Sequence, residues 1–179
     1  MSWLPDDFTP PARLDLPTGH HLRPIRASDV DIDMVAVMGS QERLFGLFGG
    51  VWGWPPATMT REQDLEDLEY HEDEMQNRSS YNYAVLDADE THLLGCVYVD
   101  PPDKIVDADA EILWWVVDDA VGTELERTLA ETLPRWIAEE WPFARPVHVG
   151  RDISFADWTA LPEPPGRETI TEDVDQPER

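Results

Sequence analysis

The stretch that decides the fold lies between residues 93 and 122, and it reads LLGCVYV at 93–99, AEILWWVV at 110–117 and DDAVG at 118–122. The first two segments are apolar runs of strand length. Such runs are typical of strands that are buried on one face or on both faces. Residues 110–117 are the most apolar run in the chain, as is typical of a central strand covered on both faces. We therefore expect two neighbouring strands here, followed by a turn.

A long helix is expected after that turn, because apolar residues recur there at helical spacing. The residues of this stripe are Val121, Leu125, Leu129, Leu133, Trp136 and Ile137. Pro134 lacks a backbone N–H group and crowds the preceding turn, so it is expected to kink or restart the helix. Residues 145–149 then predict a last strand, and residues 155–161 predict a short closing helix.

Upstream of the stretch, the pattern predicts a strand at 20–26, a helix that Ser28 or Asp29 caps, and a polar helix from Thr60. Residues 46–56 combine glycine, proline and aromatic side chains without a regular period, so we expect a loop that plugs the core or walls a pocket. Residues 81–86 predict a strand that forms a hairpin with residues 93–99.

The charge of the chain limits its partners. Its net charge is −25, from 38 acidic and 13 basic residues, and Lys104 is the only lysine. Such a surface repels nucleic acid and anionic membranes and favours cationic partners. Two explanations remain open: a halophilic cytoplasm, whose salt screens self-repulsion, or an ordinary acidic protein.

The rest of the sequence predicts the cellular compartment and the domain boundaries. Cys96 is the only cysteine, which excludes an internal disulfide, and residues 1–11 lack the features of a secretory signal. No apolar run approaches the roughly 18 residues that span a bilayer, so we expect a cytoplasmic protein with no membrane partner. We expect an N-terminal arm at 1–12, one domain at 13–162 and a flexible acidic tail at 163–179.

The order of expected elements resembles the GNAT acyltransferase fold from about His21 to Leu161. Two details strengthen the resemblance: the strand segment Leu94-Gly95-Cys96-Val97-Tyr98 and the central strand that begins Ala110-Glu111-Ile112. The resemblance implies an α/β (α+β) class, with a mixed, mostly antiparallel sheet flanked by helices. It also implies an N-acetyltransferase that uses acetyl-CoA as acyl donor.

The resemblance places the pyrophosphate of the donor at the turn before the long helix, where unpaired N–H groups and glycine favour phosphate. The residues it assigns to the cofactor are Val117, Ala120, Val121, Gly122 and Thr123. The turn departs from the family pattern, because Val117 replaces a basic or amide residue and Asp118 and Asp119 add negative charge. In the alternative interpretation, Asp118 and Asp119 cap the helix and occupy the N–H groups that a phosphate needs.

For the chemistry, the resemblance implies Glu111 as general base, because an ammonium acceptor must lose a proton before acyl transfer. Tyr98 is expected to protonate the leaving thiolate or to line the acceptor pocket, and Trp52, Trp54 and Trp114 are expected to bind the acceptor. The alternatives are a solvent-facing Glu111, a packed Tyr98 and tryptophans that only fill the core or fix a loop. The histidines and Cys96 lack metal-ligand spacing, so we expect no metal.

Three classes of function remain open on the sequence. The first is an acetyl-CoA-dependent N-acetyltransferase that acts on a small-molecule or peptide amine, with a cationic acceptor favoured by the charge. The second is a non-catalytic GNAT-like binding module, and the third is an acidic adaptor. The GNAT fold commonly ends in two further strands that form the acceptor side of the cleft, and residues 162–179 do not supply them. This acceptor wall therefore comes from a partner subunit in a homodimer, from residues 46–56, or is missing.

Overall fold

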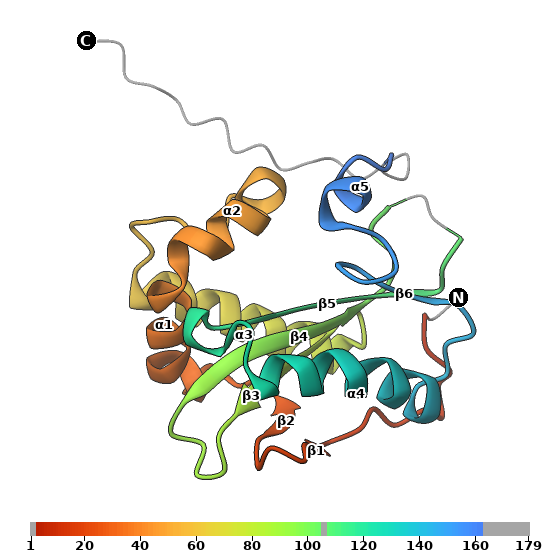
Figure 1. Cartoon of the computed structure of the whole chain (residues 1–179). Helices are drawn as coiled ribbons and strands as arrows, with labels where there is room; N and C mark the ends of the chain where they lie inside the picture. The colour runs from red at the N-terminus through yellow and green to blue at the C-terminus, as the bar shows by residue number, and fades with distance from the viewer. Residues whose placement is uncertain (1–2, 105–106, 163–179) are drawn as a thin grey trace.

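A six-stranded sheet forms the centre of the computed structural model, which describes residues 3–104 and 107–162 (Figure 1). The strand order is β1-β2-β3-β4-β5-β6. All neighbouring strands are antiparallel except β5 and β6, which are parallel. The strands are β1 (Leu14–Asp15), β2 (His21–Pro24), β3 (Tyr81–Leu86), β4 (Leu93–Asp100), β5 (Ala110–Val116) and β6 (Pro146–His148). The predicted α/β class with a mixed, mostly antiparallel sheet is confirmed.

Helices cover both faces of this sheet. The long helix α4 packs on one face, and α1, α2, α3 and α5 lie on the other (Figure 1). The α-helices are α1 (Val30–Gly39), α2 (Gln41–Trp52), α3 (Arg61–Asn77), α4 (Glu124–Glu140) and α5 (Phe155–Thr159), with short 3-10 helices η1 (Ala27–Asp29) and η2 (Asp118–Ala120). Within the described residues, no helix is both long and apolar enough to cross a membrane.

The central strand β5 distributes its side chains between these two layers. Ile112 and Val116 pack into the core under α4, whereas Leu113 and Trp115 pack into the core under α1, α2 and α3. Side chains alternate along a strand, so Glu111 points to the same face as Leu113 and Trp115. The strand is buried on both faces, as its apolar sequence predicted.

Helix α2 corrects the prediction of a loop at 46–56. The helix runs from Gln41 to Trp52 and buries Leu44 and Phe48 on one side. The burial of this apolar face offsets the low helix propensity of the glycines. Gly53 then ends the helix in the left-handed conformation, with φ +65, which glycine adopts without a steric cost.

The N-terminal segment is packed against the body of the protein. Residues 3–12 contain no helix or strand, and Leu4 among them is buried in the core under α4. The indole Nε1 of Trp3 donates to the carbonyl of Asp109 at 2.8 Å, and the Tyr83 hydroxyl donates to the carbonyl of Pro11 at 2.9 Å. The predicted tail at 163–179 lies outside the described residues.

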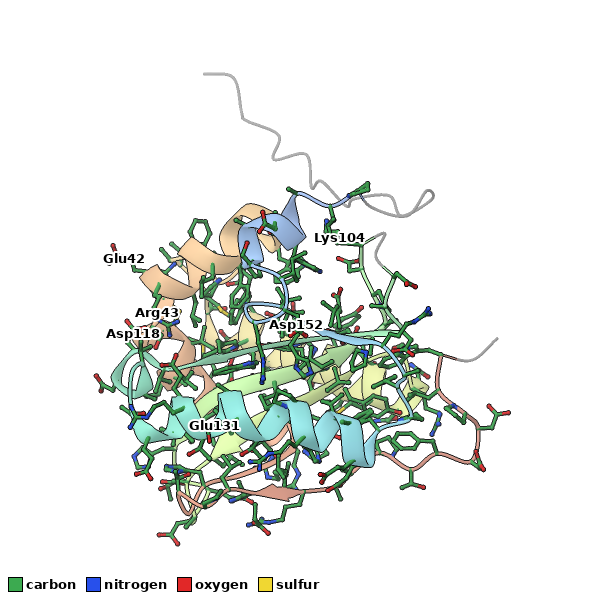
Figure 2. All side chains as sticks on the ribbon, turned by 45° about the vertical axis from the view of Figure 1, so that its right-hand side comes forward. Glu42, Arg43, Lys104, Asp118, Glu131 and Asp152 are labelled. Atoms are coloured by element: carbon green, nitrogen blue, oxygen red, sulfur yellow. The ribbon has the colours of Figure 1, made fainter. Side chains whose placement is uncertain are left out.

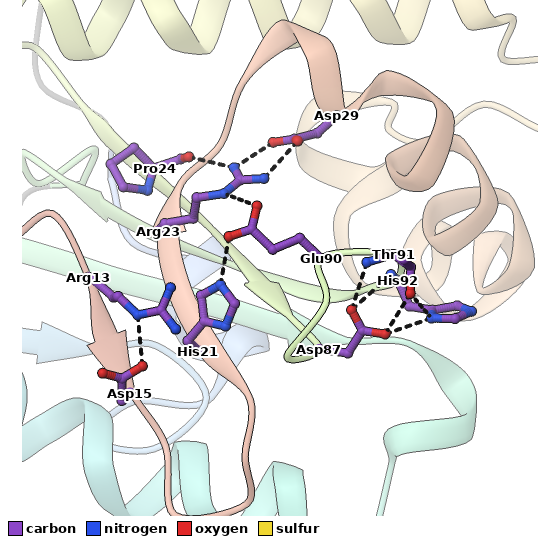
Figure 3. A network of polar contacts seen from close by, with 10 residues as sticks. All are labelled: Arg13, Asp15, His21, Arg23, Pro24, Asp29, Asp87, Glu90, Thr91 and His92. Atoms are coloured by element: carbon purple, nitrogen blue, oxygen red, sulfur yellow. Dashed lines mark hydrogen bonds and ion pairs between the residues drawn. The ribbon is translucent and has the colours of Figure 1, made fainter.

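A buried polar network fixes β2 against its surroundings (Figure 3). The guanidinium of Arg23 donates to both carboxylate oxygens of Asp29 at 2.8 and 2.9 Å and to Glu90 at 2.9 Å. The other oxygen of Glu90 lies 2.9 Å from His21 Nε2. The network therefore ties β2 to the turn between β3 and β4 and to the helical segment before α1. Asp29 also accepts a hydrogen bond from the backbone N–H of Arg26 at 2.9 Å, which stabilises that helix start.

Candidate functional site

The parallel strands β5 and β6 separate after three residue pairs. In the described chain, β6 pairs with Ala110, Glu111 and Ile112 of β5. The N–H of Val149 still donates to the carbonyl of Ile112 at 3.0 Å, and Gly150, with φ +89, then turns the chain away. The second half of β5 therefore has an open edge, which leaves space beside it.

A first cleft of about 550 Å³ lies along this open edge, between β5, α4 and the turn after β6. Trp114 and Val116 line it from β5, and Ala130 and Pro134 line it from α4. The carbonyls of Ile112 and Val116 both bond to groups on this edge. Because backbone groups of alternate residues point to the same edge, the N–H and C=O groups of Trp114 face the cleft.

Three arginines line the first cleft, although the chain as a whole is strongly acidic. Arg43 comes from α2, Arg127 from α4 and Arg151 from the turn after β6. Arg43 Nε lies 2.6 Å from Asp118 Oδ1 (Figure 2), and the same guanidinium donates to the carbonyl of Val116. Arg43 thus offsets part of the negative charge that the sequence places at this turn.

Arg151 also explains how α4 continues through Pro134. The predicted restart of the helix is wrong, because α4 runs from Glu124 to Glu140 with Pro134 inside it. A proline has no N–H to donate to the carbonyl four residues earlier. That carbonyl belongs to Ala130, and Arg151 Nη1 donates to it at 2.8 Å. The arginine replaces the missing helical hydrogen bond.

The five residues assigned to the cofactor form the turn between β5 and α4, and the turn uses most of their N–H groups internally. Val117 donates to the carbonyl of Leu94 at 2.9 Å, and Ala120 donates to that of Val117 at 2.9 Å. Val121 donates to the carbonyl of Asp118 at 3.2 Å, and Thr123 donates to that of Ala120 at 3.1 Å. These four N–H groups are therefore not free for a phosphate in this conformation.

The fifth N–H group, that of Gly122, donates to a side chain. Its partner is the carboxylate of Glu126, at 2.6 Å. The alternative in which Asp118 and Asp119 cap α4 is wrong, because these residues lie in η2 and the N-cap of α4 is Thr123. Glu126, in the first turn of the helix, occupies the position that a phosphate oxygen would take at Gly122.

A second cavity, of about 920 Å³, lies on the opposite face of β5, between α1, α2, α3 and β4. Among the described residues that line it, seven are acidic and none is lysine or arginine. The acidic residues are Asp33, Asp64, Asp67, Glu74, Asp100, Asp103 and Glu111. A cavity of this composition favours a cationic ligand. Trp115 lines both the cavity and the first cleft.

Glu111 lies at the wall of the second cavity and is 2% exposed. Its Oε2 accepts hydrogen bonds from the backbone N–H of Asp103 at 3.0 Å and from Trp158 Nε1 at 3.2 Å. Burial raises the pKa of Glu111 to about 8, helped by the charge of Asp100 and opposed by the Trp158 bond and the charge of Lys104. The alternative of a solvent-facing Glu111 is therefore wrong, and the carboxyl has the properties of a general base near neutral pH.

Residues of α2 and the turn after it lie at one side of the second cavity, next to α5. Residues 48 and 51–54 line the second cavity. Trp52 packs on Phe155 and Trp158 of α5, with ring centroids 6.4 and 5.8 Å apart. Lys104, which is labelled in Figure 2, has its Nζ 5.4 Å from the centroid of the Trp158 ring. Part of the segment 46–56 therefore lines this cavity and packs on the closing helix.

The other predicted site residues divide between the two hollows. Trp52 and Trp54 line the second cavity together with Glu111, but Trp114 lines the first cleft on the other face of β5. Tyr98 lines the second cavity, and its hydroxyl accepts a hydrogen bond from Trp115 Nε1 at 3.0 Å. Burial raises the pKa of Tyr98 well above its usual value, so the hydroxyl stays protonated.

Sequence reasoning missed the arginines of the first cleft and the Trp158 contact of Glu111. Arg43 is 75 positions from Asp118, and Trp158 is 47 positions from Glu111. Neither pair has a local sequence signal, because contacts across a sheet depend on how the elements pack.

No protein-family model matches the sequence, and no curated protein sequence matches it. Solved acetyltransferases do share its fold. RimL, a ribosomal L7/L12 alpha-N-protein acetyltransferase in complex with coenzyme A, has a TM-score of 0.61 at 17% identity, covering 76% of this chain and 73% of its own. The ribosomal-protein-S5-alanine acetyltransferase of Vibrio fischeri gives 0.58 at 15%, covering 84% and 81%. The L7/L12 N-terminal serine acetyltransferase of Salmonella typhimurium gives 0.57 at 15%, covering 76% and 73%. The chain has the fold of the GNAT acetyltransferases.

Proposed function

We propose that the chain is an acetyl-CoA-dependent N-acetyltransferase that acts on a cationic, amine-bearing acceptor. One observation carries the proposal: two hollows on opposite faces of β5 share Trp115, and their charges differ. Three arginines and two glutamates line the first cleft, whereas seven acidic residues, Glu111 among them, and no lysine or arginine line the second cavity. The arginines of the first cleft suit an anionic donor, and the carboxylates of the second cavity suit a cationic acceptor. RimL, which has the same fold, was solved with coenzyme A.

The first cleft has the groups that the donor requires. The open edge of β5 offers the backbone groups of Trp114 to a linear chain of amides such as pantetheine. Arg43, Arg127 and Arg151 offer guanidinium groups to phosphates, which arginine binds through paired hydrogen bonds. The N–H of Gly122 becomes available to a phosphate only when Glu126 releases it.

The residues around the second cavity then move the protons of the transfer. Acetyl-CoA supplies the acetyl group as a thioester. Glu111 accepts the proton that the acceptor ammonium must lose before its nitrogen bonds to the acetyl carbon. When the carbon–sulfur bond breaks, Tyr98, which is protonated and lines the same cavity, is the donor we assign to the thiolate.

Removal of the base tests this proposal. Glu111→Gln keeps the size of the side chain but cannot accept the proton, so kcat/KM should fall by about 10²-fold or more. The affinity for acetyl-CoA should stay within about twofold, because Glu111 faces the other hollow. Release of free thiol with a panel of amines measures turnover, and calorimetry measures affinity.

The matched control is Glu139→Gln, an exposed glutamate on α4. It should leave both turnover and affinity unchanged. Turnover by Glu111→Gln equal to that of the wild type would remove Glu111 from the mechanism. Loss of acetyl-CoA binding together with turnover would show that the substitution disturbs the donor cleft instead.

A non-catalytic GNAT-like binding module is the second candidate. The observation that favours it is the turn before α4, where the Gly122 N–H is already bonded to Glu126. If Glu126 does not leave this position, the pyrophosphate of acetyl-CoA has no backbone cradle. The affinity of Glu126 variants for acetyl-CoA therefore separates the two candidates.

A further inference from the structure

The carboxylate of Glu111 is bonded to the protein through one of its two oxygens. Oε2 accepts hydrogen bonds from the backbone N–H of Asp103 at 3.0 Å and from the indole Nε1 of Trp158 at 3.2 Å. No donor of the described residues bonds to Oε1, yet Oε1 is not one of the enclosed side-chain atoms without a partner. Since Glu111 lines the second cavity, Oε1 is the oxygen that reaches the space of that cavity.

The neighbours of Trp158 hold its ring in place. Trp158 is fully buried in α5, and its ring centroid lies 5.8 Å from that of Trp52 and 5.5 Å from that of Phe155. Lys104 Nζ lies over the same ring, 5.4 Å from its centroid, where the negative ring face attracts a cation. A ring packed in this way has one orientation, and its N–H points to Glu111.

The strands and the loop beside Glu111 act on it through charge. Burial is the main reason why the pKa of Glu111 is raised to about 8. Asp100, opposite Glu111 on β4, raises this pKa further, whereas the charge of Lys104, in the loop after β4, lowers it. Asp103, in the same loop, lines the cavity, and Val147, opposite Glu111 on β6, is uncharged. None of these side chains donates a hydrogen bond to the carboxylate.

Helix α5 acts on the carboxylate differently, through a hydrogen bond. The indole N–H of Trp158 can only donate, so its bond favours the ionised form of Glu111 and lowers the pKa. The acidic neighbour of Trp158 on α5, Asp157, accepts from the hydroxyl of Ser154 at 2.7 Å. Among the described residues, Trp158 is therefore the side chain that both orients Glu111 and stabilises its charge.

We propose that Trp158 is a positioning residue for the general base: its indole N–H holds Oε2 of Glu111, so that Oε1 faces the acceptor and accepts its proton. The proton moves from the ammonium nitrogen to Oε1, and the electron pair stays on the nitrogen for the bond to the acetyl carbon. The inference rests on the proposed function, since it concerns the base of the same reaction. It gives the closing helix α5 a part in that reaction.

Titration of Glu111 tests the inference without acetyl-CoA or acceptor. Carbon NMR of protein labelled at the glutamate carboxyl groups follows the pH, and the Glu111 resonance is the one that Glu111→Gln lacks. In Trp158→Phe, which keeps an aromatic ring but has no N–H, the pKa of Glu111 should rise by about half a unit or more. Trp136→Phe is the matched control, because Trp136 is also buried and its Nε1 has no partner among the described residues. It should leave this pKa unchanged.

An unchanged pKa in Trp158→Phe would overturn the inference, as would an equal rise in Trp136→Phe. If Trp158→Phe does not fold, as judged by its thermal transition, the indole N–H resonances of the wild type carry the test. One of them should move with a midpoint near the pKa of Glu111, about 8, and should lose that movement in Glu111→Gln. The absence of any such resonance would contradict the contact.

The pH profile of acetyl transfer separates this inference from the proposed function. In Trp158→Phe the acidic limb of kcat/KM should move upward with the pKa of Glu111, so that kcat/KM at pH 7 falls by about threefold or more. Transfer with an acidic limb that does not move would reject the role of Trp158 and keep the proposed function. A raised pKa of Glu111 without acetyl transfer to any amine would reject the proposed function and leave Trp158 as the group that orients Glu111.

Discussion

At the scale of single residues, the environment of Glu111 links activity to stability. Its carboxyl is buried, and its pKa in the folded protein is about 8 against a usual value of 4.5. A carboxyl with a raised pKa stabilises the folded state fully below the unfolded pKa. That contribution is lost as the pH rises through the folded pKa, so it disappears between about pH 4.5 and pH 8.

Glu111→Gln should therefore stabilise the protein at high pH. At pH 9 the variant should melt several degrees above the wild type, because no charge has to be buried and Gln still accepts a hydrogen bond from Trp158. At pH 5 the two proteins should melt at similar temperatures. Differential scanning calorimetry at both pH values checks this, with Glu139→Gln as the exposed control. A variant less stable than the wild type at pH 9 would contradict the burial of this charge.

Glu126 is the second residue whose role can be isolated. Glu126→Ala frees the Gly122 N–H and removes a negative charge, so the affinity for acetyl-CoA should rise about threefold or more at low salt. The gain should shrink in molar KCl, where charge effects are screened. Glu124→Ala removes a charge from the same turn without touching Gly122, and its gain should be smaller. Equal affinities of the two variants would show that only charge matters.

These residues also show where sequence reasoning reached its limit. The position of Glu111 at the start of a central strand could be predicted from the motif around it. Its burial could not, because Trp158 and the backbone of Asp103 come from segments whose approach depends on the whole fold. The role of Glu126 was equally hidden, since a glutamate in the first turn of a helix is ordinary.

At the scale of elements, the close approach of β4 and β5 depends on one glycine. A Cβ atom at Gly95 would lie 2.1 Å from the carbonyl oxygen of Trp115, far inside contact distance. Both partners are backbone of central strands, so neither can move without breaking the ladder. This explains why the motif Leu94-Gly95-Cys96 carries a glycine in a strand that is otherwise apolar.

Gly95→Ala should destabilise the protein by about 2 kcal/mol or more, because the strands must separate to admit the methyl group. Chemical denaturation followed by tryptophan fluorescence measures the free energy of unfolding. Gly50→Ala is the matched control, since Gly50 lies in α2 and a methyl group there would meet no atom within 4 Å, so it should be neutral or slightly stabilising. A stable Gly95→Ala protein would contradict the tight pairing.

The elements that the sequence predicted well are those with a clear period. The hairpin of β3 and β4, the buried β5 and the polar helix α3 all follow from local patterns. Helix α2 was missed because its glycines and aromatics obscured the helical spacing of Leu44 and Phe48. The sequence could not decide between a kink and a restart at Pro134, because Arg151, which compensates for Pro134, lies 21 positions from the carbonyl to which it donates.

At the scale of the whole molecule, charge is separated between two hollows. The net charge of −25 predicted a cationic partner from composition alone. Composition could not show that three arginines gather in one cleft while the cavity across β5 has an acidic lining. The fold creates that separation, because it places the cleft between α2, α4 and β6 and the cavity between α1, α3 and β4.

The central claim is that the arginine-lined cleft binds acetyl-CoA. Calorimetric titration of the wild type, Arg43→Ala and Arg135→Ala with acetyl-CoA, at low salt and in molar KCl, tests it most directly. We predict saturable binding by the wild type in molar KCl, where the repulsion from the acidic surface is screened. Arg43→Ala should weaken it about tenfold by removing a guanidinium and leaving Asp118 unpaired, while Arg135→Ala, on the exposed side of α4, should not. No heat of binding at either salt concentration would contradict the claim.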